Sequence, residues 1–208
     1  MLWAVFSSLL LATAISFAGS VQLGPVNFGT IHTALNKDKK AAILFGFGGS
    51  LPELIYCGLA FASANLLNEL QGFQEALKYL TIGILLVFGT YLFFLKSSSQ
   101  ESKHGMKKGN EVWVGATFGL LNPQLYPFWL FVITNLKTNE ILTSDHWLVQ
   151  SAFVVGSAFG AFLLQYLVAE FTTRKKEFIY MKLTKSYNKV LGSVIIAVAL
   201  VQLLINLF

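Results

Sequence analysis

Hydrophobic runs with at most one charged residue alternate along the chain with short charged segments, and this pattern predicts membrane-spanning helices. A helix needs about 20 apolar residues to cross a hydrocarbon core about 30 Å thick. Six runs meet or approach this length: Leu2 to Asn36, Ala41 to Leu67, Tyr79 to Leu95, Val112 to Leu136, Trp147 to Ala169 and Val190 to Phe208. We therefore expect an all-α polytopic membrane protein with one transmembrane domain over residues 1–208.

The composition agrees with this pattern and excludes several other classes of protein. Only 12% of the 208 residues are charged and 55% are hydrophobic, whereas soluble domains carry roughly 25% charged residues. The net charge of +5 comes from residues between apolar runs, so it indicates membrane topology and not nucleic-acid binding. A single cysteine, Cys57, excludes an intrachain disulfide and a CxxC redox centre.

The Lys and Arg residues are distributed unequally among the predicted loops. Thirteen of the 15 lie in the first, third and fifth loops, and only Lys78 and Lys137 lie in the other two. The positive-inside rule places the three basic loops in the cytoplasm, so both termini are predicted to be extracytoplasmic.

A polar stretch over residues 96–111 divides the chain into three spans and three spans. Because each half has an odd number of spans, the halves enter the membrane in opposite orientations. We expect two inverted three-helix repeats, with repeat one at 1–95, a cytoplasmic linker at 96–111 and repeat two at 112–208.

Helices 1 and 4 of this arrangement are predicted to be broken. The first run has 35 uncharged residues and would make a straight helix of roughly 52 Å, longer than the bilayer. Proline removes a backbone donor, so the break is expected at Gly24 and Pro25, and in the fourth span at Asn122 and Pro123. Each proline lies 12 residues from the charge at the predicted cytoplasmic edge, which is about 18 Å and near the bilayer centre.

Backbone groups freed at this depth must be buried in protein or line a cavity. A single proline kink would favour a role in packing, but paired breaks in inverted halves indicate a substrate site. The predicted substrate-binding residues are Gly24, Pro25, Asn27, Asn122, Pro123, Gln124 and Tyr126. Gln165 and Tyr166 of the fifth span could also line a path, although Tyr166 could instead anchor the span at the interface.

Glu53 is the only acidic or basic residue between Lys40 and Glu69. A charge near the midplane costs at least about 2.5 to 3.5 kcal/mol, so Glu53 should face a cavity or a partner and is predicted to couple transport to an ion. The alternative is a protonated carboxyl group that bonds a neighbouring helix. Cys57, one turn away, is more typical of a small apolar filler than of a metal ligand, and we expect no metal site and no cofactor.

Three short motifs near these residues resemble those of the LysE superfamily of small exporters, which includes the lysine exporter and homoserine/threonine exporter (RhtB) families. The resemblance runs over nearly the whole chain. Gly24-Pro25 with Asn27 looks like the GPxN motif of the first span, Gly48-x3-Pro52-Glu53 looks like GxxxGD, and Asn122-Pro123-Gln124 looks like NPK. Pro52 replaces a glycine, Glu53 an aspartate and Gln124 a lysine. The lost lysine affects the expected substrate more than the fold.

The resemblance implies a plasma-membrane (inner-membrane) exporter of amino acids or related metabolites, driven by a proton or cation gradient. Its implied partners are a small-molecule substrate, a coupling ion and the lipid bilayer, and a homo-oligomer is compatible with the sequence. The alternatives are an inorganic cation exporter, for which acidic ligands are few, and a membrane protein without transport activity. The sequence offers no catalytic cluster that would indicate an enzyme.

Overall fold

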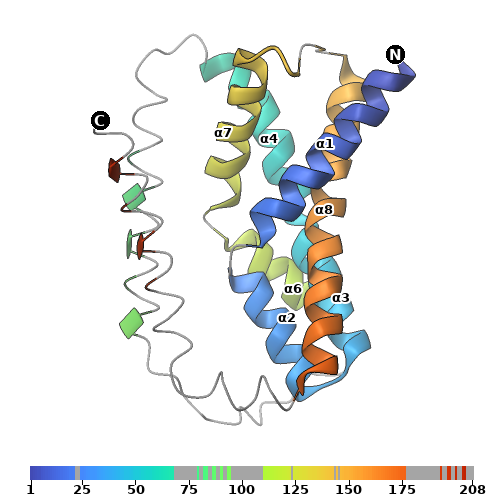
Figure 1. Ribbon diagram of the computed structural model, residues 1–208, viewed down its shortest axis with the longest axis vertical. Coiled ribbons are helices and arrows are strands. Elements are labelled where there is room, and N and C mark those ends of the chain that lie inside the picture. The colour runs from blue at the N-terminus through green and yellow to red at the C-terminus, as the bar shows by residue number, and fades with distance from the viewer. Residues whose placement is uncertain are drawn as a thin grey trace. The chain divides into compact units, whose positions relative to one another are not determined.

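The computed structural model describes residues 1–21, 24–67, 110–122, 124–142, 144 and 146–176, and isolated helical positions within 79–94 and 193–204. The chain divides into two compact units, Met1–Leu66 with Met106–Lys175 and Leu67–Gly105 with Lys176–Phe208. Figure 1 shows the helices that follow one another through the described residues of the first unit: α1 (Leu2–Ser20), α2 (Pro25–Asn36), α3 (Lys39–Ser50), α4 (Pro52–Leu67), α6 (Glu111–Leu120), α7 (Leu125–Thr138) and α8 (Trp147–Arg174).

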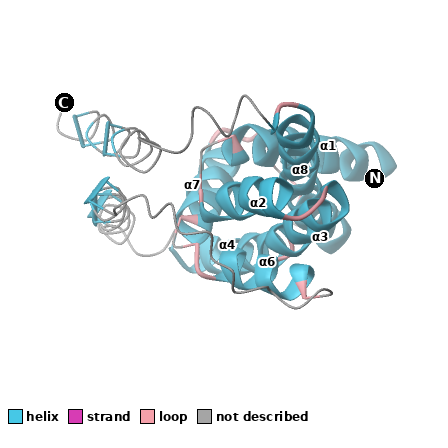
Figure 2. Cartoon of the chain, turned by 90° about the horizontal axis from the view of Figure 1, so that it is seen from below, coloured by secondary structure: helices cyan, strands magenta, loops and turns pink. Residues whose placement is uncertain are grey.

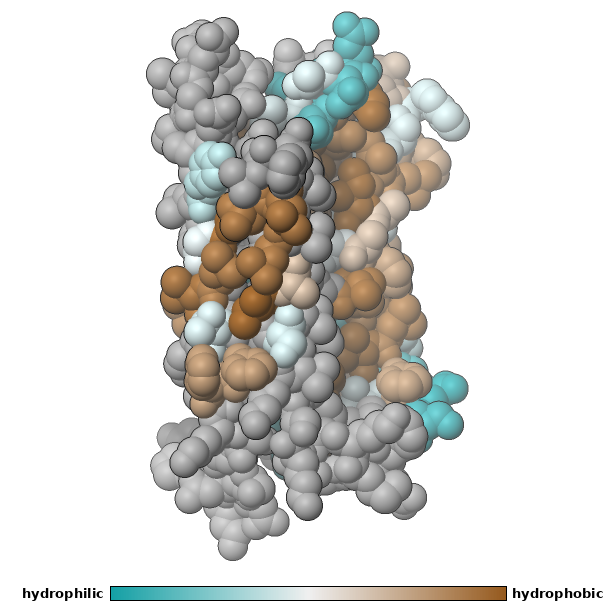
Figure 3. Space-filling model, turned by 60° about the vertical axis from the view of Figure 1, so that its left-hand side comes forward, coloured by the Kyte–Doolittle hydropathy of each residue, from teal (hydrophilic) through white to brown (hydrophobic). Residues whose placement is uncertain are grey.

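The apolar helices agree with a polytopic membrane protein. Three helices among the described residues are long and apolar enough to cross a membrane: Leu2–Ser20, Lys39–Ala64 and Trp147–Arg174. On the face shown in Figure 3, hydrophobic residues dominate the middle of the described part, and hydrophilic residues lie towards its ends. The third and sixth predicted spans lie largely outside the described residues, so six spans in two inverted repeats stay a prediction.

The first predicted span is broken where the sequence indicated. Helix α1 ends at Ser20 and α2 begins at Pro25, and Gly24 between them is extended, with φ −104° and ψ 179°. Proline suits the first position of a helix, because the missing N–H would have no intrahelical acceptor there. The chain therefore forms two shorter helices in place of a single helix of roughly 52 Å.

The fourth predicted span is also broken, in a tighter turn. Helix α6 ends at Leu120 and α7 begins at Leu125, while Pro123 lies outside the described residues. The backbone N–H of Asn122 donates to the backbone carbonyl of Gly119 at 3.1 Å, and the backbone N–H of Leu125 donates to the backbone carbonyl of Asn122 at 3.4 Å. These short-range bonds keep the two half-helices close together.

The second and fifth spans are more continuous. Helices α3 and α4 are separated only by Leu51, whose backbone is still helical. The interruption arises because Pro52 has no amide hydrogen to donate. Helix α8 runs on to Arg174, so the predicted end of the fifth span at Ala169 underestimates the helix. The extension has a local cause: Arg174 Nε lies 2.6 Å from Glu170 Oε1 across one helical turn, a favourable spacing.

Two pairs of helices pack through glycines. A Cβ atom on Gly156 of α8 would overlap the Leu9 carbonyl of α1, and one on Gly48 of α3 would overlap the Val112 carbonyl of α6. Such contacts are possible only where a helix has no side chain, so glycine brings the backbones together. Helix α2 lies between α8 on one side and α3 and α6 on the other (Figure 2).

Charged residues gather at one end of the first unit. Lys37 Nζ, just beyond α2, lies 3.0 Å from Glu111 Oε1 at the start of α6, and Lys39 forms an ion pair with Glu170 of α8. These residues come from the first predicted loop, the end of the linker and the end of the fifth span. The fold thus brings together three segments that charge counting had assigned to one side of the membrane.

Candidate functional site

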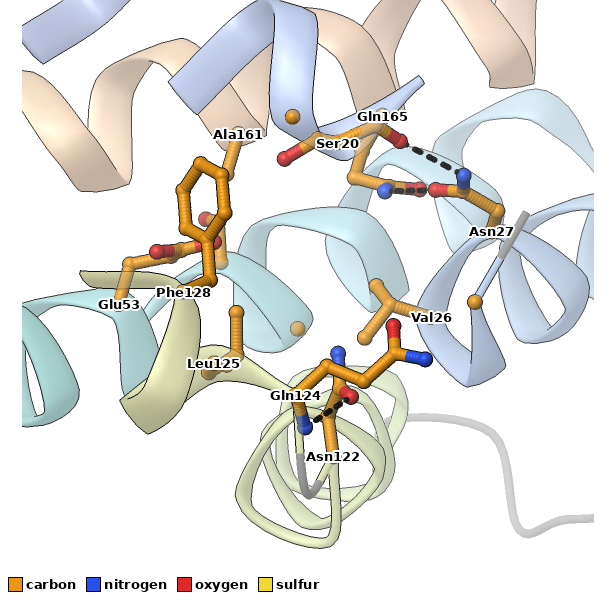
Figure 4. Close-up of a pocket in the computed structure, with 14 residues that line it drawn as sticks. Ser20, Val26, Asn27, Glu53, Asn122, Gln124, Leu125, Phe128, Ala161 and Gln165 are labelled. Atoms are coloured by element: carbon orange, nitrogen blue, oxygen red, sulfur yellow. Dashed lines mark hydrogen bonds between the residues drawn. The ribbon is translucent and has the colours of Figure 1, made fainter. Parts of the chain in front are cut away.

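A pocket lies where the α1–α2 break and the α6–α7 break meet, and Figure 4 shows its lining. Its volume is about 70 Å³. The lining residues come from α1, α2, α3, α4, the α6–α7 break, α7 and α8: Gly19, Ser20, Gly24, Val26, Asn27, Gly49, Ser50, Glu53, Asn122, Gln124, Leu125, Phe128, Ala161 and Gln165. Segments about 100 residues apart in sequence therefore share one cavity.

The structure brings most of the predicted site residues to this pocket. Those that line it are Gly24, Asn27, Glu53, Asn122 and Gln124. Pro25 begins α2 without lining the pocket, and Pro123 lies outside the described residues. The Tyr126 side chain is directed elsewhere, because its hydroxyl donates to Ser63 Oγ at 3.0 Å.

On one side of the pocket, three buried residues form what we call the amide network: Asn27, Thr30 and Gln165. Asn27 Nδ2 donates to the Ser20 carbonyl at 2.9 Å, Gln165 Nε2 donates to Asn27 Oδ1, and Thr30 Oγ1 donates to Gln165 Oε1 at 2.7 Å. Figure 4 shows the first two bonds. The Asn27 amide therefore caps a carbonyl in the last turn of α1, which would otherwise have lost its partner at the break.

On the other side, Glu53 of α4 and Trp129 of α7 form what we call the acid pair. Trp129 Nε1 donates to Glu53 Oε2, and the two side chains are 0% and 4% exposed, respectively. Within the part of the chain that the structure describes, no Lys, Arg or His forms an ion pair with Glu53. The indole thus supplies a hydrogen bond that a buried carboxyl group requires.

Sequence reasoning had not identified Trp129 as part of the site. The chain has four tryptophans, and Trp3, Trp113 and Trp147 lie near span ends and are exposed. Trp129 lies inside α7 and is fully buried. Because a buried indole N–H needs an acceptor, a tryptophan away from the interface was a signal that could have pointed to a polar partner.

The second break is satisfied by different groups. Asn122 Oδ1 accepts from the backbone N–H of Gln124 at 3.1 Å, and the Tyr56 hydroxyl of α4 donates to the Leu120 carbonyl at 2.6 Å. The N-terminal ends of α2 and α7 both border the pocket, at Gly24 and Gln124. Helix N-termini carry partial positive charge, so the pocket combines two such ends with the acidic Glu53.

The comparison with known families identifies the group of proteins that shares this pattern. The family model described as LysE type translocator matches residues 17–206, which include both breaks and Glu53. The chain belongs to the LysE type translocator family. No curated protein and no solved structure matches it. The resemblance carried by the three sequence motifs is confirmed.

Membership of the LysE type translocator family, together with the apolar helices, makes the chain a multi-pass membrane protein. The family is one of membrane translocators, which suggests an exporter of amino acids or other small molecules. Among the described residues of this translocator, no group of three or more His, Cys, Asp or Glu side chains could hold a metal ion. The described lining offers amides, serine hydroxyls, helix ends and one carboxyl group.

Proposed function

We propose that this translocator exports amino acids or related small metabolites across the plasma membrane, in exchange for a proton or another cation. The observation that carries the proposal is that both helix breaks and Glu53 line one pocket. Freed backbone at membrane depth is tolerated where it borders a cavity. A pocket of this kind between two broken helices is characteristic of secondary transporters.

The pocket offers complementary partners to an amino-acid zwitterion. The N-terminal ends of α2 and α7 favour a carboxylate, and Glu53 favours an ammonium group. Asn122 and Gln124 add neutral hydrogen-bonding groups beside them. Since none of the described lining residues is Lys or Arg, the substrate carboxylate would rest on helix ends and amides.

Glu53 is the proposed ion-coupling residue. A buried carboxyl group that accepts only neutral donors is stable when protonated and needs a cation when ionised. A substrate ammonium group and a proton would then compete for the same carboxylate, which exchanges one for the other. The net movement of substrate outward would follow the inward movement of the coupling ion.

The proposed alternating access involves two inverted halves, and the packing of the first unit supports this. Gly156 of α8 meets Leu9 of α1, and four residues further along both helices Gly160 meets Thr13, so α1 and α8 are parallel. Helices α3 and α6 are also parallel, because their contacts advance in the same direction along both helices. Helices α3 and α8 run in opposite directions, since Lys39 meets Glu170 and Phe47 meets Phe162. Helices α1 and α6 are therefore antiparallel, as inverted repeats require.

The size of the cavity implies that the protein must change its conformation to admit a substrate. Its volume of about 70 Å³ has room for a few water molecules, whereas ligand sites typically measure roughly 300–1,000 Å³. The two halves must therefore separate around the pocket to admit a substrate. Phe128, Val26 and Leu125 are the larger apolar lining residues whose displacement would widen it.

The coupling proposal is tested with purified protein in proteoliposomes loaded with labelled amino acids and subjected to a proton gradient. Glu53→Gln should lose gradient-driven release of the labelled amino acid while still inserting into the liposomes and unfolding at the normal temperature. The matched control is Glu140→Gln, which changes an exposed acid beyond α7. Full gradient-driven transport by Glu53→Gln would refute the coupling role.

The substrate site is tested by a double substitution, Asn27→Ala with Asn122→Ala, which removes the amides of both breaks. Substrate binding should weaken, while Asn135→Ala, at an exposed amide on α7, should bind normally. Unchanged binding in the double variant would mean that the breaks shape helix packing and do not bind the substrate. Accumulation of divalent metal ions in place of amino acids would favour the inorganic cation exporter, for which the described lining supplies only one carboxylate.

A further inference from the structure

Trp129 connects the carboxyl group of Glu53 to the opposite wall of the pocket. Its ring is 0% exposed and donates its N–H to Glu53 Oε2. The same ring lies edge-on to Phe128, with centroids 5.1 Å apart, and to Phe153 of α8, with centroids 5.7 Å apart. Any displacement of the indole must therefore change its contact with Phe128.

Phe128 in turn lies over the end of α1. A Cβ atom on Gly19 would come within 2.6 Å of Phe128 Cζ, so the ring occupies the space that the missing side chain of Gly19 leaves. Phe128 and Gly19 both line the pocket, and Figure 4 shows the ring projecting across it near Glu53. Four residues thus form a continuous contact path: Glu53, Trp129, Phe128 and Gly19.

We propose that Trp129 is a positioning residue that couples the charge of Glu53 to the Phe128 ring, so that protonation of Glu53 or capture of its charge by a substrate cation releases Phe128 from Gly19. This inference rests on the proposed function, in which Glu53 is the coupling group. A hydrogen bond to a carboxylate is roughly twice as strong as one to a neutral carboxyl oxygen. The ionised form therefore holds the indole and the adjoining Phe128 in place.

The surroundings of Glu53 make it the group that can drive this change. Along α4, Cys57 lies one turn away, buried against Ser157 of α8. The polar lining residues that α8 and the second break contribute are amides, Gln165, Asn122 and Gln124. On α7, Tyr126 is bonded to Ser63 instead. A change of charge at this point thus acts first on the indole.

A single-tryptophan protein gives a direct readout. Trp3, Trp113 and Trp147 are 78%, 74% and 67% exposed, so replacing all three with Phe leaves Trp129 as the sole emitter. Its emission should change with pH in this background, and adding Glu53→Gln should remove that change. The proposal would be overturned if the Trp129 emission still changed with pH after Glu53→Gln, or if it did not change with pH when Glu53 is present.

Access to the pocket is measured with Ser20→Cys in a Cys57→Ser background, using a membrane-impermeant maleimide added from the extracytoplasmic side. Labelling should be about fivefold to tenfold faster when Glu53 is protonated, because a bond to a charged group is stronger than a neutral one by about 1–1.4 kcal/mol, which corresponds to that change in an equilibrium. Asn139→Cys, at an exposed position after α7, corrects for the pH dependence of the thiol reaction.

Two variants separate the indole bond from the ring contact. Trp129→Phe keeps an aromatic ring but removes the donor, and should abolish the pH dependence of labelling. Phe128→Leu leaves the acid pair intact, and should give fast labelling at every pH. Retention of the wild-type pH dependence in both variants refutes the inference. Because labelling requires no substrate, it is independent of the transport assay, which alone tests the proposed function.

Discussion

On one side of the pocket, Asn27 of α2 hydrogen-bonds Gln165 of α8, and on the other, Trp129 of α7 hydrogen-bonds Glu53 of α4. In each case the second half of a broken span bonds a helix beside it. The amide network contains no titratable side chain, whereas the acid pair contains one. A change of pH therefore acts on one side of the pocket alone, and the other side keeps its geometry.

This difference separates two tasks that a coupled transporter must perform. The amide network fixes the geometry of the first break through the bond from Asn27 to the Ser20 carbonyl. In the proposed function, the acid pair exchanges a proton for a cation, and its indole contacts the Phe128 ring. We infer that substrate positioning depends more on the first side and coupling more on the second. Three predictions test this comparison.

The largest effect is expected at the glycines that bring two pairs of helices together, α3 with α6 and α1 with α8. Gly48→Ala and Gly156→Ala each place a Cβ atom on a backbone carbonyl of the neighbouring helix. Since backbone atoms cannot give way locally, each variant should lose about 3 kcal/mol of stability or more, the upper end of the usual cost of overpacking. The measurement is the thermal unfolding midpoint of the purified protein in detergent.

Gly58→Ala on α4 is the matched control, because nothing lies within 4 Å of its new Cβ atom. It should be neutral or slightly stabilising, since alanine is the better helix former. If only one of the two contact glycines proves sensitive, the halves are not packed equivalently, and the support for inverted repeats is lost.

A smaller effect is expected from Gln165→Ala. The substitution leaves Asn27 Oδ1 without its Gln165 donor and the Thr30 hydroxyl without its acceptor, which should cost about 1–3 kcal/mol because both groups are buried. Substrate affinity should fall. The pH dependence of transport should remain that of the wild type, since the acid pair is intact.

Transport by this variant is measured at several values of pH alongside Glu53→Gln, which should show the reverse pattern of nearly normal stability and lost coupling. A Gln165→Ala variant that loses its pH dependence would mean that the two sides act as one network. Asn135→Ala again reports the effect of removing an amide at the surface.

The smallest effect is expected from Thr30→Val, which keeps the shape of a fully buried side chain and removes one donor. We expect a loss of about 0.5–1.5 kcal/mol. Thr117→Val is the control, because that exposed hydroxyl bonds only the Trp113 carbonyl of its own helix. Equal unfolding midpoints for the two variants would show that the Thr30 bond adds nothing to the amide network.

Local features of the sequence determined a large part of this protein. Long uncharged runs predicted α1, α3 with α4, and α8, because apolar length is a property of consecutive residues. Gly24-Pro25 and Asn122 located the breaks, because proline and glycine act on their own turn of the backbone. Glu53 was identified because a lone charge in an apolar run needs a partner wherever the helix packs.

Only the tertiary structure decided which partners these residues have. Gln165 lies 138 residues from Asn27 and Trp129 lies 76 from Glu53, and neither separation follows from helical periodicity. Tyr126 was predicted at the site from its position beside the break, but the rotation of α7 directs it to Ser63. The sequence thus determined where the helices could break, and helix packing decided which side chains satisfy each break, because those bonds join surfaces that meet only after folding.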